Sequence, residues 1–166
     1  MRILVAGIGN IFFGDDAFGC EVVRELMRCE WPEGVRVEDF GIRSYDLVYA
    51  IMDGYDAVIL IDAVSRGHAP GTVSLIEPTL DETDAADRES VDAHSMNPLR
   101  VLQLARSQGG PMPRLYLVGC EPAVLETEEL GLSEPVRAAV PHAVEMVLSH
   151  IQTMRAETRG GSRTEV

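Results

Sequence analysis

The chain opens with Met1-Arg-Ile-Leu-Val-Ala-Gly-Ile-Gly-Asn10 and continues, after three residues, with Gly14-Asp15-Asp16-Ala17-Phe18-Gly19. An apolar run that ends in glycines and leads into a helical pattern predicts the first strand, loop and helix of an α/β domain. A helix N-terminus has free N–H groups and usually attracts an anion. Because Asp15 and Asp16 already stand at this one, the loop suits a cation, or a cationic part of a substrate, better than a pyrophosphate.

The size and composition of the chain predict a single α/β domain. Its 166 residues, 46% of them hydrophobic, suffice for a core without disulfides or a structural metal. We expect this domain over residues 1–155 and a flexible tail over residues 156–166, which are rich in Arg, Gly, Ser, Thr and Glu. No segment has the pattern of a signal peptide or a membrane span, so we expect a cytoplasmic protein. The three scattered cysteines form no C-x-x-C pair and are expected to be buried thiols.

The charge of the chain argues against two classes of partner. Its formal net charge is −13, and all 14 basic residues are arginine. Such a negative field repels nucleic-acid phosphates and anionic lipid surfaces, so we expect neither nucleic acid nor membrane as a partner. We expect the protein to be a monomer.

Hydrophobic periodicity predicts strands and helices in alternation. The expected strands are nearly continuous apolar runs, typical of a sheet covered on both faces, at Arg2–Ala6, Val35–Phe40, Ala57–Asp62, Thr72–Ile76 and Leu115–Cys120. Helices are expected at Ala17–Cys29, Tyr45–Met52, Asn97–Gln108 and from about Ser133 to Met154. Pro141 is expected to bend the last helix or to delay its start.

The link between the third and fourth strands decides the topology. Nine residues, including Gly67, Pro70 and Gly71, join Asp62 to Thr72, and this is too few for a helical crossover. The fourth strand should therefore be antiparallel. With right-handed crossovers elsewhere, we predict an α/β fold: a three-layer α/β/α sandwich with a mixed five-stranded sheet of order 2-1-3-5-4.

Three polar residues are predicted to meet at the switch point of this sheet. Ligands bind outside the carboxyl ends of the strands where the winding reverses, here between strands one and three. Asp16 follows the first strand, Asp62 ends the third, and His94 precedes the third helix. Two carboxylates and an imidazole suit a divalent transition metal such as nickel, copper or zinc. The alternatives are helix capping by Asp16, an Asx-turn at Asp62, and a cap or surface position for His94.

The glycines of the first loop also allow a test for dinucleotide binding. Gly7 and Gly9 fit the fingerprint and Asp39 ends the second strand, but Phe12 stands where the third glycine is required. The adjacent carboxylates would also repel a pyrophosphate. We therefore expect no organic cofactor. The chain has no G-x-S-x-G, P-loop or H-E-x-x-H motif. It therefore lacks the residues of serine, phosphoryl-transfer and zincin mechanisms.

Several motifs, taken in order, resemble those of the hydrogenase maturation endopeptidases. They are Gly7-Ile-Gly-Asn10, Gly14-Asp15-Asp16-Ala17-Phe18-Gly19, Ile59-Leu60-Ile61-Asp62-Ala63, Ala69-Pro70-Gly71-Thr72, the loop residue His94 and Leu117-Val118-Gly119. The resemblance covers about residues 1–150. It implies an endopeptidase that removes a short C-terminal extension from the large-subunit precursor of a nickel–iron hydrogenase after nickel insertion.

The resemblance also implies a catalytic site that contacts a metal. Its residues in this chain would be Asp16, Asp62 and His94, and the metal would be nickel supplied by the substrate. An open anionic site without thiolates would hold a free ion weakly, but it could complete the coordination of nickel bound by substrate cysteines. Asp16 is Glu in some relatives and Ala17 is Gly in many, and neither difference removes the carboxylate. A non-catalytic metal chaperone or carrier with the same crevice is the alternative.

The turn after the second strand is predicted to contact the substrate. The family commonly has an Asp-Gly-Gly-like turn here, whereas this chain continues from Asp39 with Phe40-Gly41-Ile42-Arg43. We assign Asp39, Gly41 and Arg43 to recognition of the substrate tail, with Arg43 as a partner for a carboxylate. A plain left-handed turn at Gly41 is the alternative.

Overall fold

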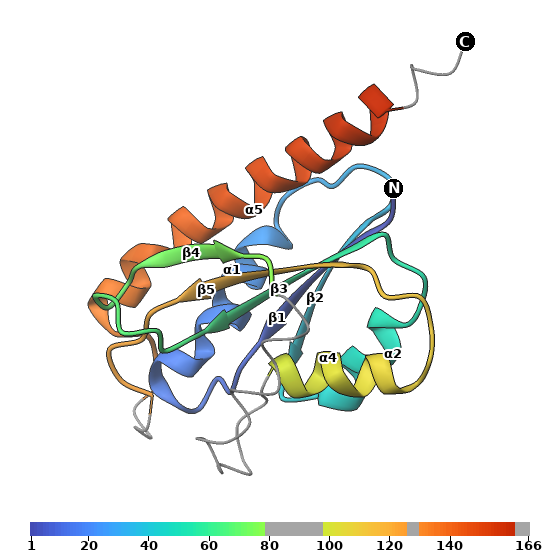
Figure 1. The fold of residues 1–166 in the computed structure, drawn as a ribbon. Coiled ribbons are helices and arrows are strands. Elements are labelled where there is room, and N and C mark those ends of the chain that lie inside the picture. The colour runs from blue at the N-terminus through green and yellow to red at the C-terminus, as the bar shows by residue number, and fades with distance from the viewer. Residues whose placement is uncertain (79–97, 126–129, 162–166) are drawn as a thin grey trace.

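The structure is a computed structural model that describes residues 1–78, 98–125 and 130–161. In chain order its elements are β1 (Ile3–Ile8), η1 (Gly14–Ala17, a 3-10 helix), α1 (Phe18–Leu26), β2 (Val35–Gly41), α2 (Ser44–Ile51), β3 (Ala57–Ala63), β4 (Val73–Ile76), α4 (Pro98–Ser107), β5 (Arg114–Cys120) and α5 (Glu134–Gly161). Figure 1 shows a twisted central sheet with helices on both faces. None of the helices in these ranges is long and apolar enough to cross a membrane.

The described strands form one sheet in the order β2-β1-β3-β5-β4. The pairs β2–β1, β1–β3 and β3–β5 are parallel, and β4 is antiparallel to β5. The predicted fold class, strand order and antiparallel fourth strand are therefore confirmed. The short link before β4 returns the chain to the outer edge of β5 without a helix, as its length requires.

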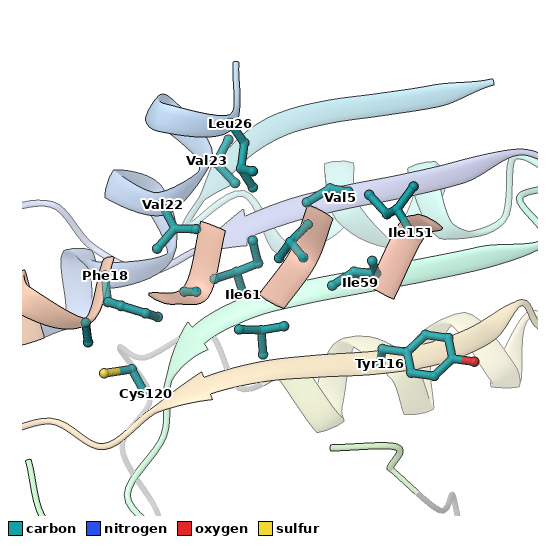
Figure 2. Packing of buried hydrophobic residues seen from close by; sticks show 14 of the residues in the cluster. Val5, Phe18, Val22, Val23, Leu26, Ile59, Ile61, Tyr116, Cys120 and Ile151 are labelled. Carbon is teal, nitrogen blue, oxygen red and sulfur yellow. The ribbon is translucent and has the colours of Figure 1, made fainter. Parts of the chain in front are cut away.

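Alternate strand residues fill two cores, one on each face of the sheet. Helices α1 and α5 cover one face, and α2 and α4 cover the other (Figure 1). Figure 2 shows the first core, where side chains of β1, β3 and β5 meet those of α1 and α5 at Val5, Ile59, Ile61, Tyr116, Phe18, Val22 and Ile151. The second core holds the intervening strand residues Leu4, Ala6, Val58, Leu60 and Leu117. Because a slip by one residue would exchange the two cores, burial fixes the strand register.

The ends of two helices differ from the sequence prediction. The predicted helix at Ala17–Cys29 is a 3-10 turn, η1, followed by α1 from Phe18 to Leu26. The last helix begins at Glu134 and contains Pro141, so the proline does not delay its start. It continues to Gly161, so residues 156–161 of the predicted tail are helical. Residues 162–166 of the predicted tail lie outside the described residues.

Glycines allow the start of α1 to sit directly on the sheet. A Cβ atom added at Gly19 would overlap the carbonyl oxygens of Ile61 and Ile8, at the ends of β3 and β1. A Cβ atom at Gly7 would lie 2.6 Å from the carbonyl oxygen of Gly19. The close helix–strand approach that a third loop glycine gives in dinucleotide-binding loops is thus supplied here by Gly7 and Gly19. As a result, the residues just before Gly19 are held over the ends of β1 and β3.

Candidate active site

Two carboxylates lie at the switch point between β1 and β3. Asp16 is carried by η1, just before the glycine that seats α1 on the ends of these strands. Asp62 is the next residue after Ile61 in β3. The charge of Asp16 reaches Asp62 strongly enough to raise its pKa. The structure therefore places Asp16 after β1 and Asp62 near the end of β3, at the edge of the sheet where the sequence predicted them.

Asp16 is half-buried and bound by the loop that precedes it. Its Oδ2 accepts a hydrogen bond from the backbone N–H of Asn10 at 2.7 Å. No side chain caps η1 or α1, so the alternative that Asp16 is a helix cap is wrong. Burial raises the pKa of Asp16, and the hydrogen bond from Asn10 opposes that rise.

Asp62 is almost fully enclosed, with 5% of its surface exposed. Its Oδ1 accepts a hydrogen bond from the N–H of Ala63 at 2.8 Å, whereas the N–H of Val64 donates to the carbonyl oxygen of Cys120. An Asx-turn would use the N–H two residues on, so that alternative is wrong as well. Burial, and then the negative charge of Asp16, raise the pKa of Asp62 well above its ordinary value.

The electrostatics of Asp16 and Asp62 favour a nearby cation. Two neighbouring carboxylates in a desolvated place disfavour ionisation of both, and a nearby cation reverses that preference. The predicted third member, His94, lies outside the described residues. Within residues 1–78, 98–125 and 130–161, no cluster of three His, Cys, Asp or Glu residues could hold a metal ion. The described part of the site is therefore the pair Asp16 and Asp62.

Asp15 has a structural role that could not be seen in the sequence. Its carboxylate accepts hydrogen bonds from the N–H groups of Ala123, Val124 and Ser133 and from the Ser133 hydroxyl, at 2.7 to 2.9 Å. Burial opposes ionisation of Asp15, but these bonds outweigh it and lower its pKa. The sequence grouped Asp15 with Asp16 at the mouth of the loop, whereas the structure uses it to tie η1 to the segment that leads into α5.

The predicted substrate-binding turn lies beside the same loop. Gly41 has a φ of 55°, so the left-handed turn is present, and its N–H donates to Asp39 Oδ1 at 2.9 Å. The carbonyl oxygen of Gly41 accepts the N–H of Gly9 at 3.0 Å, which joins the two loops. The Arg43 guanidinium lies 3.1 Å from Asp46 Oδ2 and 3.7 Å from Glu38 Oε1, and it donates to the carbonyl oxygen of Asp39.

The cysteines are not arranged as metal ligands. Cys20 and Cys120 are buried and Cys29 is half-buried, which largely confirms the expected buried thiols. Burial, followed by a hydrogen bond with Asp39 and the charge of Asp39, raises the pKa of Cys20. Burial likewise raises the pKa of Cys120 to about 11. Cys20, which is close to the site, is therefore a neutral thiol at physiological pH.

Similar solved structures are those of peptidases. The hydrogenase maturating endopeptidase HybD from Escherichia coli is 34% identical, with a TM-score of 0.78 over 93% of this chain and 94% of that chain. The hydrogenase 2 maturation peptidase from a Thaumarchaeota archaeon is 33% identical, with a TM-score of 0.67 over 92% of this chain and 99% of that chain. Together with the two carboxylates at the edge of the sheet, these likenesses define the class of the protein as an α/β endopeptidase.

Sequence comparison then identifies the family. A family model described as hydrogenase maturation protease matches residues 20–150. The hydrogenase expression/formation protein HupM from Azotobacter chroococcum is 36% identical over 152 residues, which are 90% of this chain and 71% of that protein. The chain belongs to the hydrogenase maturation protease family. The family resemblance predicted from the sequence motifs is confirmed.

Proposed function

We propose that the protein is the endopeptidase that removes the C-terminal extension from the nickel-loaded large-subunit precursor of a nickel–iron hydrogenase. One observation carries this proposal. In a chain of this family, Asp16 follows β1 and Asp62 stands near the end of β3, and burial raises the pKa of both carboxyl groups. A desolvated acidic pair of this kind favours a cation, and the nickel held by the precursor supplies one.

The donor set supports contact with a metal that the substrate carries. The described site offers the carboxylate oxygens of Asp16 and Asp62 as ligands, with His94 proposed as the third contact. Such a set would compete poorly for free nickel, yet it can complete a coordination sphere that substrate cysteines already form. Asp16, Asp62 and His94 would then sense the loaded nickel and hold the precursor so that one peptide bond lies in the crevice.

Cleavage in this scheme is of the aspartyl type. A water molecule, activated by an aspartate or polarised by the substrate's nickel, attacks the peptide carbonyl. The C–N bond then breaks and a proton from the water passes to the leaving amine, while the nickel would offset the negative charge that develops on the carbonyl oxygen. We propose that Asp39, Gly41 and Arg43 contact the substrate tail beside this site. We further propose that the protein acts in the cytoplasm as a monomer and needs no organic cofactor.

The number of products formed per protein molecule separates the protease from a metal chaperone or carrier. A nickel-loaded large-subunit precursor is incubated with a substoichiometric amount of the protein, and the shortened product is quantified by intact mass spectrometry. The protease yields many product molecules for each protein molecule. A carrier would bind the precursor and leave its mass unchanged, and that result would refute the proposal.

A further inference from the structure

A cavity of about 320 Å³ lies beside the loop that binds Asp16. It lies between the loop after β1 and the turn after β2, and its lining includes Gly9, Phe12, Phe40 and Ile42. The two walls are joined by the hydrogen bond from the Gly9 N–H to the Gly41 carbonyl oxygen, at 3.0 Å. This volume is at the lower end of the range for ligand sites, about 300 to 1,000 Å³, and suits one or two side chains.

Large apolar side chains stand exposed at the rim of this cavity. Phe12 is 62% exposed, Ile42 is 59% exposed and Ile11 is 38% exposed. A single exposed apolar residue is ordinary, but these three come from two loops and line one hollow. The rim therefore offers apolar surface that a bound peptide would remove from water.

The polar groups of the cavity are already engaged inside the protein. The Arg43 guanidinium pairs with Asp46 and Glu38, and Asp39 Oδ1 accepts the N–H of Gly41. The Cys20 thiol donates to the Gly9 carbonyl oxygen at 3.5 Å, and burial raises its pKa. Because four large apolar side chains and two glycines line the cavity, an ionised side chain entering it would lose hydration, so the lining favours an uncharged, apolar occupant.

The cavity lies beside the loop that binds Asp16. Asn10 lines the cavity, and its N–H is the donor to Asp16 Oδ2 at 2.7 Å. A peptide whose scissile bond lies at Asp16 can therefore place a neighbouring side chain in the cavity.

We propose that this cavity is a specificity subsite that receives an apolar side chain of the precursor next to the cleaved bond. The proposal rests on the function proposed above, because the occupant is part of the same substrate. It assigns Phe12 and Ile42 as specificity-determining residues beside Asp39, Gly41 and Arg43.

The test uses Phe12→Ser and Ile42→Ser, with Met27→Ser as a matched control. Met27 is 58% exposed and lies at the far end of α1 from Asp16, so its replacement removes a similar exposed apolar side chain away from the cavity. The probe is the nickel-loaded large-subunit precursor of a nickel–iron hydrogenase from the same genome. The dissociation constant is measured by surface plasmon resonance, KM and kcat by intact mass, and folding by circular dichroism.

Phe12→Ser and Ile42→Ser should each raise the dissociation constant and KM by about tenfold, leave kcat within about twofold, and keep the native spectrum. Met27→Ser should behave as the wild type. Unchanged dissociation constants for both cavity variants would overturn the subsite. Cleavage by the wild type is read separately: an intact precursor would refute the proposed function, whereas the ratio of variant to wild-type affinity tests the subsite alone.

Discussion

Asp15 and Asp16 are adjacent in the chain, yet their carboxylates have opposite environments. Asp15 is met by four hydrogen-bond donors, which lower its pKa despite complete burial. Asp16 has one backbone donor, and burial raises its pKa. Donors stabilise the ionised form, whereas desolvation and like charge oppose it. One carboxylate therefore stabilises the fold, and the other is kept in an unfavourable state that a cation can relieve.

The replacement Asp62→Asn should abolish function and stabilise the fold. An amide keeps an oxygen for the Ala63 N–H but carries no charge, so cleavage of a loaded precursor should fall by about a hundredfold or more. Because folding raises the pKa of Asp62 above 3.8, its ionisation costs stability at neutral pH, and the variant should melt at a higher temperature.

The difference in stability between the wild type and Asp62→Asn should depend on pH. Below pH 3.8 Asp62 is protonated in both the folded and the unfolded protein, so wild type and variant should have similar stability. The advantage of Asn should grow as pH rises from there through the raised folded pKa. Melting curves over pH 3 to 8 and cleavage assays measure the two effects. A variant that processes the precursor at the wild-type rate would exclude Asp62 from the site.

The replacement Asp15→Asn should have the opposite effect on stability. It removes a charge that accepts four hydrogen bonds, and unfolding should become easier by about 2 kcal/mol. Because folding lowers this pKa, the contribution of Asp15 is present above pH 3.8 and is lost as pH falls through the folded pKa. Urea titrations at pH 7 and below measure the change. The control is Asp53→Asn, which alters an exposed ion pair with Arg2 and should change the stability little. Equal effects of the two replacements would refute the role of Asp15 as an anchor.

At the scale of elements, the site depends on how closely α1 sits on the sheet. Gly19 lies against the carbonyl oxygens of Ile8 and Ile61, and Asp16 precedes it by three residues. Any displacement of the start of α1 therefore moves Asp16 relative to Asp62. The tie from Asp15 to Ser133 holds the same turn from the side of α5.

The replacement Gly19→Ala tests this close contact between α1 and the sheet. Its methyl group would overlap two backbone carbonyl oxygens, which cannot give way as a side chain can, so we expect a loss of about 2 to 3 kcal/mol and impaired cleavage. Gly160→Ala in α5 is the matched control, because a methyl group there meets no atom within 4 Å. It should leave stability unchanged or slightly raised. Thermal unfolding and cleavage rates compare the two variants, and a harmless Gly19→Ala would contradict the close approach.

The sequence could predict these elements because each had a local signal. Buried strands appear as apolar runs, and the nine-residue link after Asp62 excluded a crossover helix and so determined the edge strand. The sequence carried no comparable signal for the 3-10 turn before α1 or for the close contact of Gly19 with the sheet. Both depend on how the ends of β1 and β3 lie in the folded protein. The extension of α5 to Gly161 was missed because the composition of that segment is typical of a tail.

At the scale of the molecule, residues far apart in the sequence build the site. Asp16 and Asp62 could be predicted because each follows a strand whose carboxyl end lies at the switch point. The partners of Asp15 could not be predicted, since they lie 108 to 118 residues away and are mostly backbone groups. Nor could the contact of Arg43 with Glu38, which depends on how the turn after β2 folds back. Topology thus locates the carboxylates, and packing decides what each one does.

The nickel dependence of cleavage tests the central claim of a metal-sensing acidic site most directly. Nickel-loaded and nickel-free samples of one large-subunit precursor are incubated with the protein, and the intact mass of each is measured. We predict that the loaded precursor loses a C-terminal peptide and that the nickel-free precursor keeps its full mass. Equal cleavage of both samples would contradict the claim that Asp16 and Asp62 act through the nickel of the substrate.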